Sequence, residues 1–183
     1  MQIRYNLLFL FLFSITTLQS QQKDTFGKFT SEEIAMTTYS KDTTANAVVL
    51  HESGNNYFKV INDRIRIVKE YHVKIKILNK KGFDQATISI PLRRNEKLAE
   101  KLEGLKAITH NGVNKTQVLS KDVFTKDVHE FVTERTFTFP NLKEGSILEY
   151  KYKLISPFIY NFKGWDFQAE IPKIYSEFNA EIP

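Results

Sequence analysis

The chain has no cysteine, and its 183 residues include only seven glycines, five prolines and one tryptophan. Without cysteine there are no disulfides, no thiolate metal ligands and no cysteine nucleophile. The few glycines are scattered and form no glycine-rich phosphate loop. A domain of this kind must be stabilised by its apolar core, and 15 Phe and 8 Tyr supply large side chains for it.

Long apolar runs are also missing, except at the N-terminus. The stretch from Leu7 to Leu18 is dominated by Leu, Phe and Ile, follows Arg4, and is succeeded by the small residue Ser20. This order is typical of a secretory signal peptide. A run of about 12 residues is too short to span a bilayer, which takes about 20. We therefore expect residues 1–20 to be a signal peptide rather than an uncleaved anchor. Residues 21–183 are then an exported domain, periplasmic or at the cell surface, with no transmembrane span after cleavage.

Charges of both signs are mixed along the chain, whose net charge is only +5. The 26 Lys and Arg are interspersed with 21 Asp and Glu, so no basic block indicates nucleic-acid binding. The four histidines, His51, His72, His110 and His129, show no spacing typical of metal ligands. We interpret them as surface side chains, because a site needs convergent partners. No metal and no cofactor are expected.

Alternation of apolar and polar residues predicts a mainly β fold. Strands are expected at 47–52, 57–61, 64–78, 86–90, 105–109, 115–119, 129–139, 146–155 and 173–182. Turns are expected at 53–56, 79–82 and 110–113, and short helices after Thr30, where Glu33 completes a capping-box spacing, and over 95–102. Such spacing of short strands predicts an antiparallel β-sandwich, or an open barrel, with one or two short helices.

Two of these strands show which side chains should face water. In 64–78 the polar face is expected to carry Arg64, Arg66, Glu70, His72, Lys74 and Lys76, and a bend or bulge is expected near Lys69–Glu70 because the segment is long. In 146–155 we expect Leu148, Tyr150, Tyr152 and Leu154 to face inward, and Glu149, Lys151 and Lys153 to face outward.

Catalytic patterns are scarce. No serine lies in a Gly-x-Ser-x-Gly elbow, and cysteine is absent, so no nucleophilic triad is indicated. Glu130 and Glu134 share one face of a predicted strand and are the only carboxylate pair that we weigh for an enzyme. One aromatic-rich segment is the candidate partner contact, or alternatively a cap on the core: Phe158, Tyr160, Phe162, Trp165 and Phe167.

Five motifs follow one another in a fixed order: 45–50 (Ala-Asn-Ala-Val-Val-Leu), 73–82 (Val-Lys-Ile-Lys-Ile-Leu-Asn-Lys-Lys-Gly), 139–152 (Phe-Pro-x4-Gly-Ser-Ile-Leu-Glu-Tyr-x-Tyr), 165–172 (Trp-x-Phe-Gln-x3-Pro) and 176–183 (Ser-Glu-x4-Ile-Pro). With them, residues 26–183 resemble a secreted bacterial family of unknown function. Its members carry this β-rich domain directly before a transglutaminase-like (papain-like cysteine) domain.

The resemblance implies a β-sandwich accessory domain without catalytic residues, since the family's Cys, His and Asp lie in the following domain. It also implies that the β-rich domain continues beyond Pro183, so this chain is expected to be truncated. The expected function is a non-catalytic interdomain or substrate-positioning module, with a transglutaminase-like domain or an envelope protein as partner. Two alternatives stay open: a free-standing envelope module that binds glycan or peptide, and a non-functional gene fragment.

Overall fold

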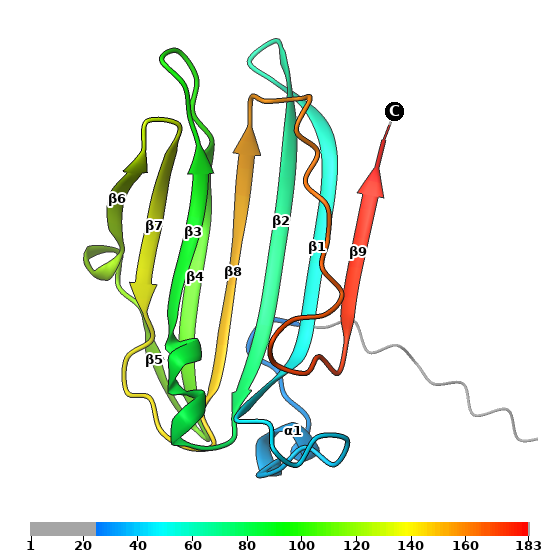
Figure 1. Ribbon diagram of the computed structural model, residues 1–183, viewed down its shortest axis with the longest axis vertical. Helices are drawn as coiled ribbons and strands as arrows, with labels where there is room; N and C mark the ends of the chain where they lie inside the picture. The colour runs from blue at the N-terminus through cyan, green and yellow to red at the C-terminus, as the bar shows by residue number, and fades with distance from the viewer. Residues whose placement is uncertain (1–24, 183) are drawn as a thin grey trace, which may run out of the picture.

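Nine strands in two sheets account for most of residues 25–182, the part of the chain that the computed structural model describes (Figure 1). The predicted signal peptide lies outside these residues. In chain order the elements are α1 Ser31–Ala35, β1 Ala47–Ile61, β2 Arg64–Ile77, η1 Lys80–Ala86 (a 3-10 helix), β3 Thr87–Arg93, β4 Lys101–Asn111, β5 Asn114–Gln117, η2 Ser120–Asp122 (3-10), β6 Phe124–His129, β7 Val132–Thr138, β8 Ile147–Ser156 and β9 Ser176–Glu181.

The larger sheet has six strands in the order β5-β4-β8-β2-β1-β9, and the smaller has three in the order β3-β7-β6. All pairs are antiparallel except β1 and β9, which run parallel. The predicted mainly β sandwich with short helices is therefore confirmed. The two strands predicted around Pro140–Gly145 both exist, but β7 belongs to the small sheet and β8 to the large one.

The main core lies between the two sheets. Val73, Ile75, Leu148 and Tyr150 of the large sheet share one apolar cluster with Phe137 of the small sheet. Beyond the small sheet, the loop 157–172 continues this layer: it runs alongside β1 in Figure 1, and Pro172 accepts a hydrogen bond from the Val49 amide (2.9 Å). The same face of the large sheet is therefore covered partly by strands and partly by an irregular segment.

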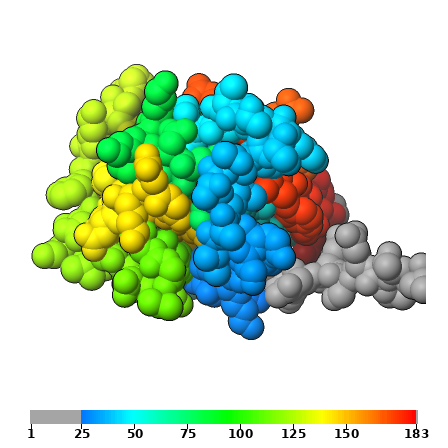
Figure 2. Space-filling model, turned by 90° about the horizontal axis from the view of Figure 1, so that it is seen from below, coloured from blue at the N-terminus to red at the C-terminus, as the bar shows by residue number. Residues whose placement is uncertain are grey.

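A smaller cluster occupies the opposite face of the large sheet. Val48, Leu50 and Ile147 are covered there by Phe29 and Met36 of the N-terminal segment. Figure 2 shows this segment, in blue, over one end of the molecule. The capping box predicted at Thr30 is confirmed: its hydroxyl accepts from the Glu33 amide (3.1 Å), and the Glu33 carboxylate accepts from the Thr30 amide (2.7 Å).

The turn predicted at 53–56 is wrong, because β1 runs unbroken through it. The chain reverses later, at Asn62 and Asp63, whose φ angles of 50° and 59° suit the central positions of a type I′ hairpin turn. Gly54 has another role: a Cβ there would lie 2.3 Å from the indole of Trp165. The glycine thus makes room for a tryptophan that packs on the strand, which local turn chemistry cannot reveal.

Other local predictions also fail. The bulge expected at Lys69–Glu70 lies instead in β1, between Val49 and His51. The helix expected over 95–102 is absent. The side-chain oxygen of Asn95 accepts from the Lys97 amide (3.0 Å), which forms an Asx turn, and from the Leu98 amide (2.7 Å), and β4 begins at Lys101. The strand β6 was not predicted. The turn predicted at 79–82 is confirmed, because the Gly82 amide donates to the Asn79 carbonyl (3.0 Å) at the capped start of η1.

Replacing Gly54 by Ala tests the Trp165 contact. The added methyl group must displace the indole, so we expect a loss of about 1–3 kcal/mol in the free energy of unfolding, as for other overpacked sites. Gly164→Ala is the matched control, since a Cβ at Gly164 meets nothing within 4 Å and its φ is not positive. Urea unfolding measures both. Equal stability of the two variants would contradict the assigned packing.

Candidate functional site

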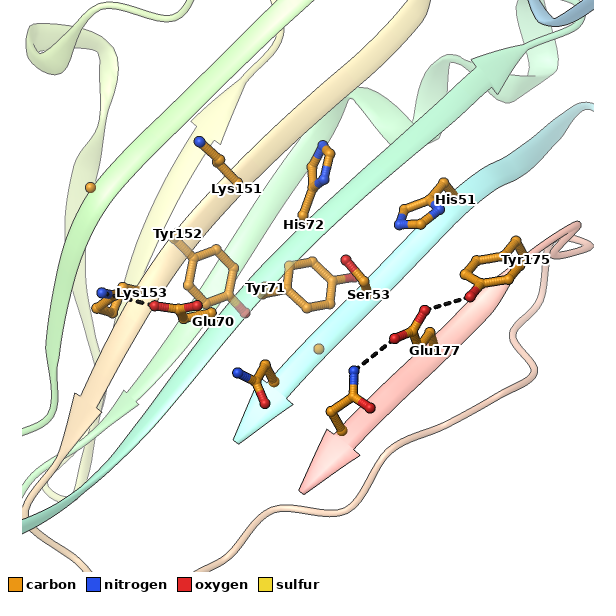
Figure 3. Close-up of a pocket in the computed structure, with 14 residues that line it drawn as sticks. His51, Ser53, Glu70, Tyr71, His72, Lys151, Tyr152, Lys153, Tyr175 and Glu177 are labelled. Atoms are coloured by element: carbon orange, nitrogen blue, oxygen red, sulfur yellow. Dashed lines mark hydrogen bonds and ion pairs between the residues drawn. The ribbon is translucent and has the colours of Figure 1, made fainter. Parts of the chain in front are cut away.

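A groove of about 940 Å³ lies on the face of the large sheet that the N-terminal segment leaves open. Its floor is formed by β8, β2, β1 and β9, and Tyr175 lies at its rim beside β9 (Figure 3). Side chains on one face of a sheet that are opposite each other on neighbouring strands lie next to each other. The strand register therefore determines which polar groups meet in the groove.

Two rows of side chains cross the floor. The pairings of β8, β2, β1 and β9 place Lys151, His72, Ser53 and Glu177 in one row. The next row, two residues along each strand, holds Lys153, Glu70, Asn55 and Asn179. Lysines thus lie at the β8 side and a carboxylate at the β9 side, with neutral hydrogen-bonding groups on β1 between them (Figure 3).

The second row is internally paired at its β8 end. Lys153 Nζ lies 2.8 Å from the Glu70 carboxylate, which also accepts a hydrogen bond from the Tyr57 hydroxyl (3.2 Å). The hydrogen bond from Lys153 is the main reason why the pKa of Glu70 is lowered. This pair is about half exposed, so its contribution to stability is small.

At the β9 side, Glu177 accepts hydrogen bonds from the Tyr175 hydroxyl and from the Asn179 amide (2.7 Å). The bond from Tyr175 is the largest cause of its lowered pKa. The Tyr175 ring in turn stacks on His51, with ring centroids 5.0 Å apart. These contacts hold a carboxylate and an aromatic ring at one rim of the groove.

The other end of the groove is closed by a buried cluster centred on Glu149. Its carboxylate is fully buried and accepts hydrogen bonds from His72 Nε2 and His110 Nε2, each at 2.9 Å. The Gly27 amide, 2.9 Å from both carboxylate oxygens, is a third donor. Burial raises the pKa of Glu149, but the bonds from His110, His72 and Gly27 outweigh it and lower the pKa to about 2.

The same cluster fixes the N-terminal segment to the sheet. Phe29 packs edge-on against His110, and Phe26 lies against His72, with centroid distances of 4.7 and 5.5 Å. Lys74 Nζ donates to the Lys28 carbonyl (2.7 Å), and Lys76 Nζ donates to the Ile34 carbonyl (2.8 Å). Burial lowers the pKa of Lys76.

These contacts overturn several sequence predictions. His110 is buried, not in a surface turn, and Glu149, Lys74 and Lys76 are buried although they lie on the polar face of their strands. Their strand positions were predicted correctly, but the N-terminal segment covers the face on which they lie. The only sequence signal for this cover is Phe26 and Phe29 at the start of the domain, which alternation within strands does not capture. His129 lies exposed in β6, as expected.

The candidate partner contact is divided by the structure. Phe158 is buried, Phe162 stacks on Phe58, and Trp165 stacks on Phe178, so these three belong to the fold. Tyr160 and Phe167 are 74% and 57% exposed and remain available for contact. All five lie on the loop between β8 and β9, on the side of the large sheet opposite the groove.

Below the groove floor, a second buried carboxylate holds this loop in place. Glu52 accepts hydrogen bonds from the Tyr71 hydroxyl and from Lys173 Nζ, each at 2.6 Å. Lys173 also donates to the Asp166 carbonyl (2.6 Å). Burial is the main reason why the pKa of Tyr71 is raised. The loop and the groove floor are thus joined through strands β1 and β2.

No catalytic constellation is assembled within residues 25–182. The Ser53 hydroxyl forms no hydrogen bond with a described histidine, and no group of three or more His, Asp or Glu in this range could hold a metal ion. Glu130 lies in the turn after β6, and Glu134 lies in β7 opposite Pro91 and Lys126. No helix in the described range is long and apolar enough to cross a membrane.

Glu149→Gln tests the buried cluster. In the folded protein the pKa of Glu149 is lowered to about 2, from an ordinary value of 4.5. Its contribution to stability is therefore complete above pH 4.5 and is lost as the pH falls toward 2. We expect the variant to lose about 3 kcal/mol at neutral pH, the scale of hydrogen bonds to a charged group. Urea unfolding at several pH values should show a weaker acid dependence than in the parent. Glu130→Gln, at an exposed position, is the control and should behave like the parent protein.

No family model and no curated protein matches this chain. Among solved structures, it is similar to a "putative protease" from Parabacteroides distasonis, with a TM-score of 0.51 and 10% sequence identity. The match covers 61% of this chain and 23% of that protein. At this identity the likeness concerns the fold alone, and it spans less than a quarter of the larger protein.

Proposed function

We propose that this chain is a non-catalytic accessory domain of a secreted protein that also has a transglutaminase-like domain. Its role is to position a partner or substrate. The observation that carries this proposal is the open groove of about 940 Å³, which offers many hydrogen-bonding groups but, among the described residues, no nucleophile hydrogen-bonded to a base. Residues of this kind can hold a ligand without transforming it.

The likeness to part of a larger protein supports the same reading. A sandwich that corresponds to 23% of a "putative protease" is the size of one domain among several. The motif resemblance independently suggests a β-rich domain before a papain-like cysteine domain. Tyr160 and Phe167 are the side chains that would contact such a domain, because aromatic residues are enriched in protein interfaces.

A free-standing envelope module is the second candidate. It is favoured by the groove itself, whose floor is formed by four neighbouring strands of one sheet. In that case ligand binding would need no other domain. A gene fragment without function, the third reading, would neither bind a ligand nor contact a partner.

The first test is the nucleotide sequence downstream of the Pro183 codon. An open frame that encodes a domain with Cys, His and Asp would supply the partner. We then expect Tyr160→Ser and Phe167→Ser together to weaken its association with this chain by about tenfold or more, the scale of an interface hot spot. The melting temperature should stay unchanged because both rings are exposed.

Phe124→Ser is the control for that experiment, since Phe124 is 65% exposed on β6, in the small sheet. Analytical ultracentrifugation of the mixed proteins measures the association. An equal effect of the control, or none from the double variant, would count against this contact. A stop codon after Pro183 would favour the free-standing module.

A further inference from the structure

Charged side chains of opposite sign lie at the two sides of the groove. At the β8 side, Lys151 lines the groove, and Lys106 on β4, which is not part of the lining, is its neighbour in the strand register. The Nζ atoms of Lys106 and Lys151 lie 4.7 and 5.1 Å from the centre of the Phe26 ring. Both side chains are exposed, and neither forms an ion pair with any of residues 25–182. Two ammonium groups on one ring repel each other, and an anion between them would relieve that repulsion.

The β9 side is the complement. Glu177 accepts hydrogen bonds only from neutral donors in the described range, the Tyr175 hydroxyl and the Asn179 amide. Its carboxylate therefore has no lysine or arginine partner among these residues, although the nearby His51 also lowers its pKa, and it is ionised at neutral pH. An ammonium group is the ligand chemistry that would match it.

The distance between these charges sets the length of a ligand. From β8 to β9 there are three strand spacings of about 4.8 Å each, or about 14 Å, and an extended peptide advances about 3.4 Å per residue. Four residues therefore bridge the two sides. Between them Ser53 and Asn55 on β1 offer hydrogen-bonding groups for peptide amides.

We propose that the groove binds a short peptide with free termini, about four residues long. Its α-carboxylate lies at Lys106 and Lys151, and its α-ammonium group lies at Glu177. This inference deepens the proposed substrate-positioning function and rests on it.

Charge and aromatic content favour a peptide over a glycan. A neutral sugar would leave both sets of end charges without a partner. Of the tyrosines that line the groove in the described range, Tyr71 and Tyr152 pack against the main core, and His51 already stacks on Tyr175, with ring centroids 5.0 Å apart. An anionic polymer would meet Glu70 and Glu177 in the same groove. A zwitterionic peptide would pair with the charged side chains at both sides of the groove.

The test is titration calorimetry of the full chain with tetra-alanine that has free termini. Acetylating the amino end or amidating the carboxyl end should each weaken binding by about tenfold, the scale of one charge-assisted hydrogen bond. Glu177→Gln should weaken binding of the free peptide equally and should make the protein insensitive to acetylation. The double variant Lys106→Met and Lys151→Met should do the same for amidation.

Lys126→Met, at an exposed position on β6, is the control and should bind like the parent. Equal binding of free and blocked peptides, no binding of the free peptide, or binding of a neutral oligosaccharide that ignores these substitutions would overturn the proposal. Such a failure is distinguishable from a failure of the accessory role. The latter is read from Tyr160 and Phe167, on the loop that packs over the opposite face of the large sheet.

Discussion

Burial of the Glu149 carboxylate is the constraint on which one whole face of the large sheet depends. A charged group without water is tolerated only if its hydrogen bonds are satisfied inside the protein. Here two histidines from β2 and β4 and the amide of Gly27 satisfy it. The Gly27 amide can reach the carboxylate only because the N-terminal segment crosses the sheet. The register of the strands and the position of the N-terminal segment are therefore both needed to satisfy the Glu149 carboxylate.

The opposite face of the large sheet is covered in a different way. The small sheet covers only part of it, and the loop 157–172 covers the rest. Trp165 can approach the strands closely because Gly54 has no side chain, and Glu52 binds Lys173 and Tyr71 beneath it. An irregular loop thus takes the place of strands, with polar contacts that substitute for a ladder of backbone hydrogen bonds.

The groove is the part of the polar face of the large sheet that the N-terminal segment leaves uncovered. The N-terminal segment closes one end of the polar face, and the remaining area of β8, β2, β1 and β9 stays open. Lys153 and Glu70 pair with each other at its β8 side, whereas Lys151 at that side and Glu177 at the β9 side form no ion pair with a Lys, Arg, Asp or Glu of the described range. A surface of this type is suited to orienting a charged ligand. With no nucleophile and base assembled in the described range, positioning is the function that the geometry supports best.

The amino-acid sequence by itself determined the β-rich class, most strands and the Thr30 capping box, because these depend on the alternation of side chains and on contacts within a few residues. It also placed Glu149, Lys74 and Lys76 correctly on the polar faces of their strands. Only the tertiary structure decided that these residues are buried, since that depends on a segment many positions away in the chain. The same holds for Gly54, whose sequence context predicts a turn but whose role is to leave room for Trp165. Whether the face of a strand is buried depends on which distant segment packs across it. The spacing of residues within the strand carries no information about that segment, so long-range packing overrides the local pattern.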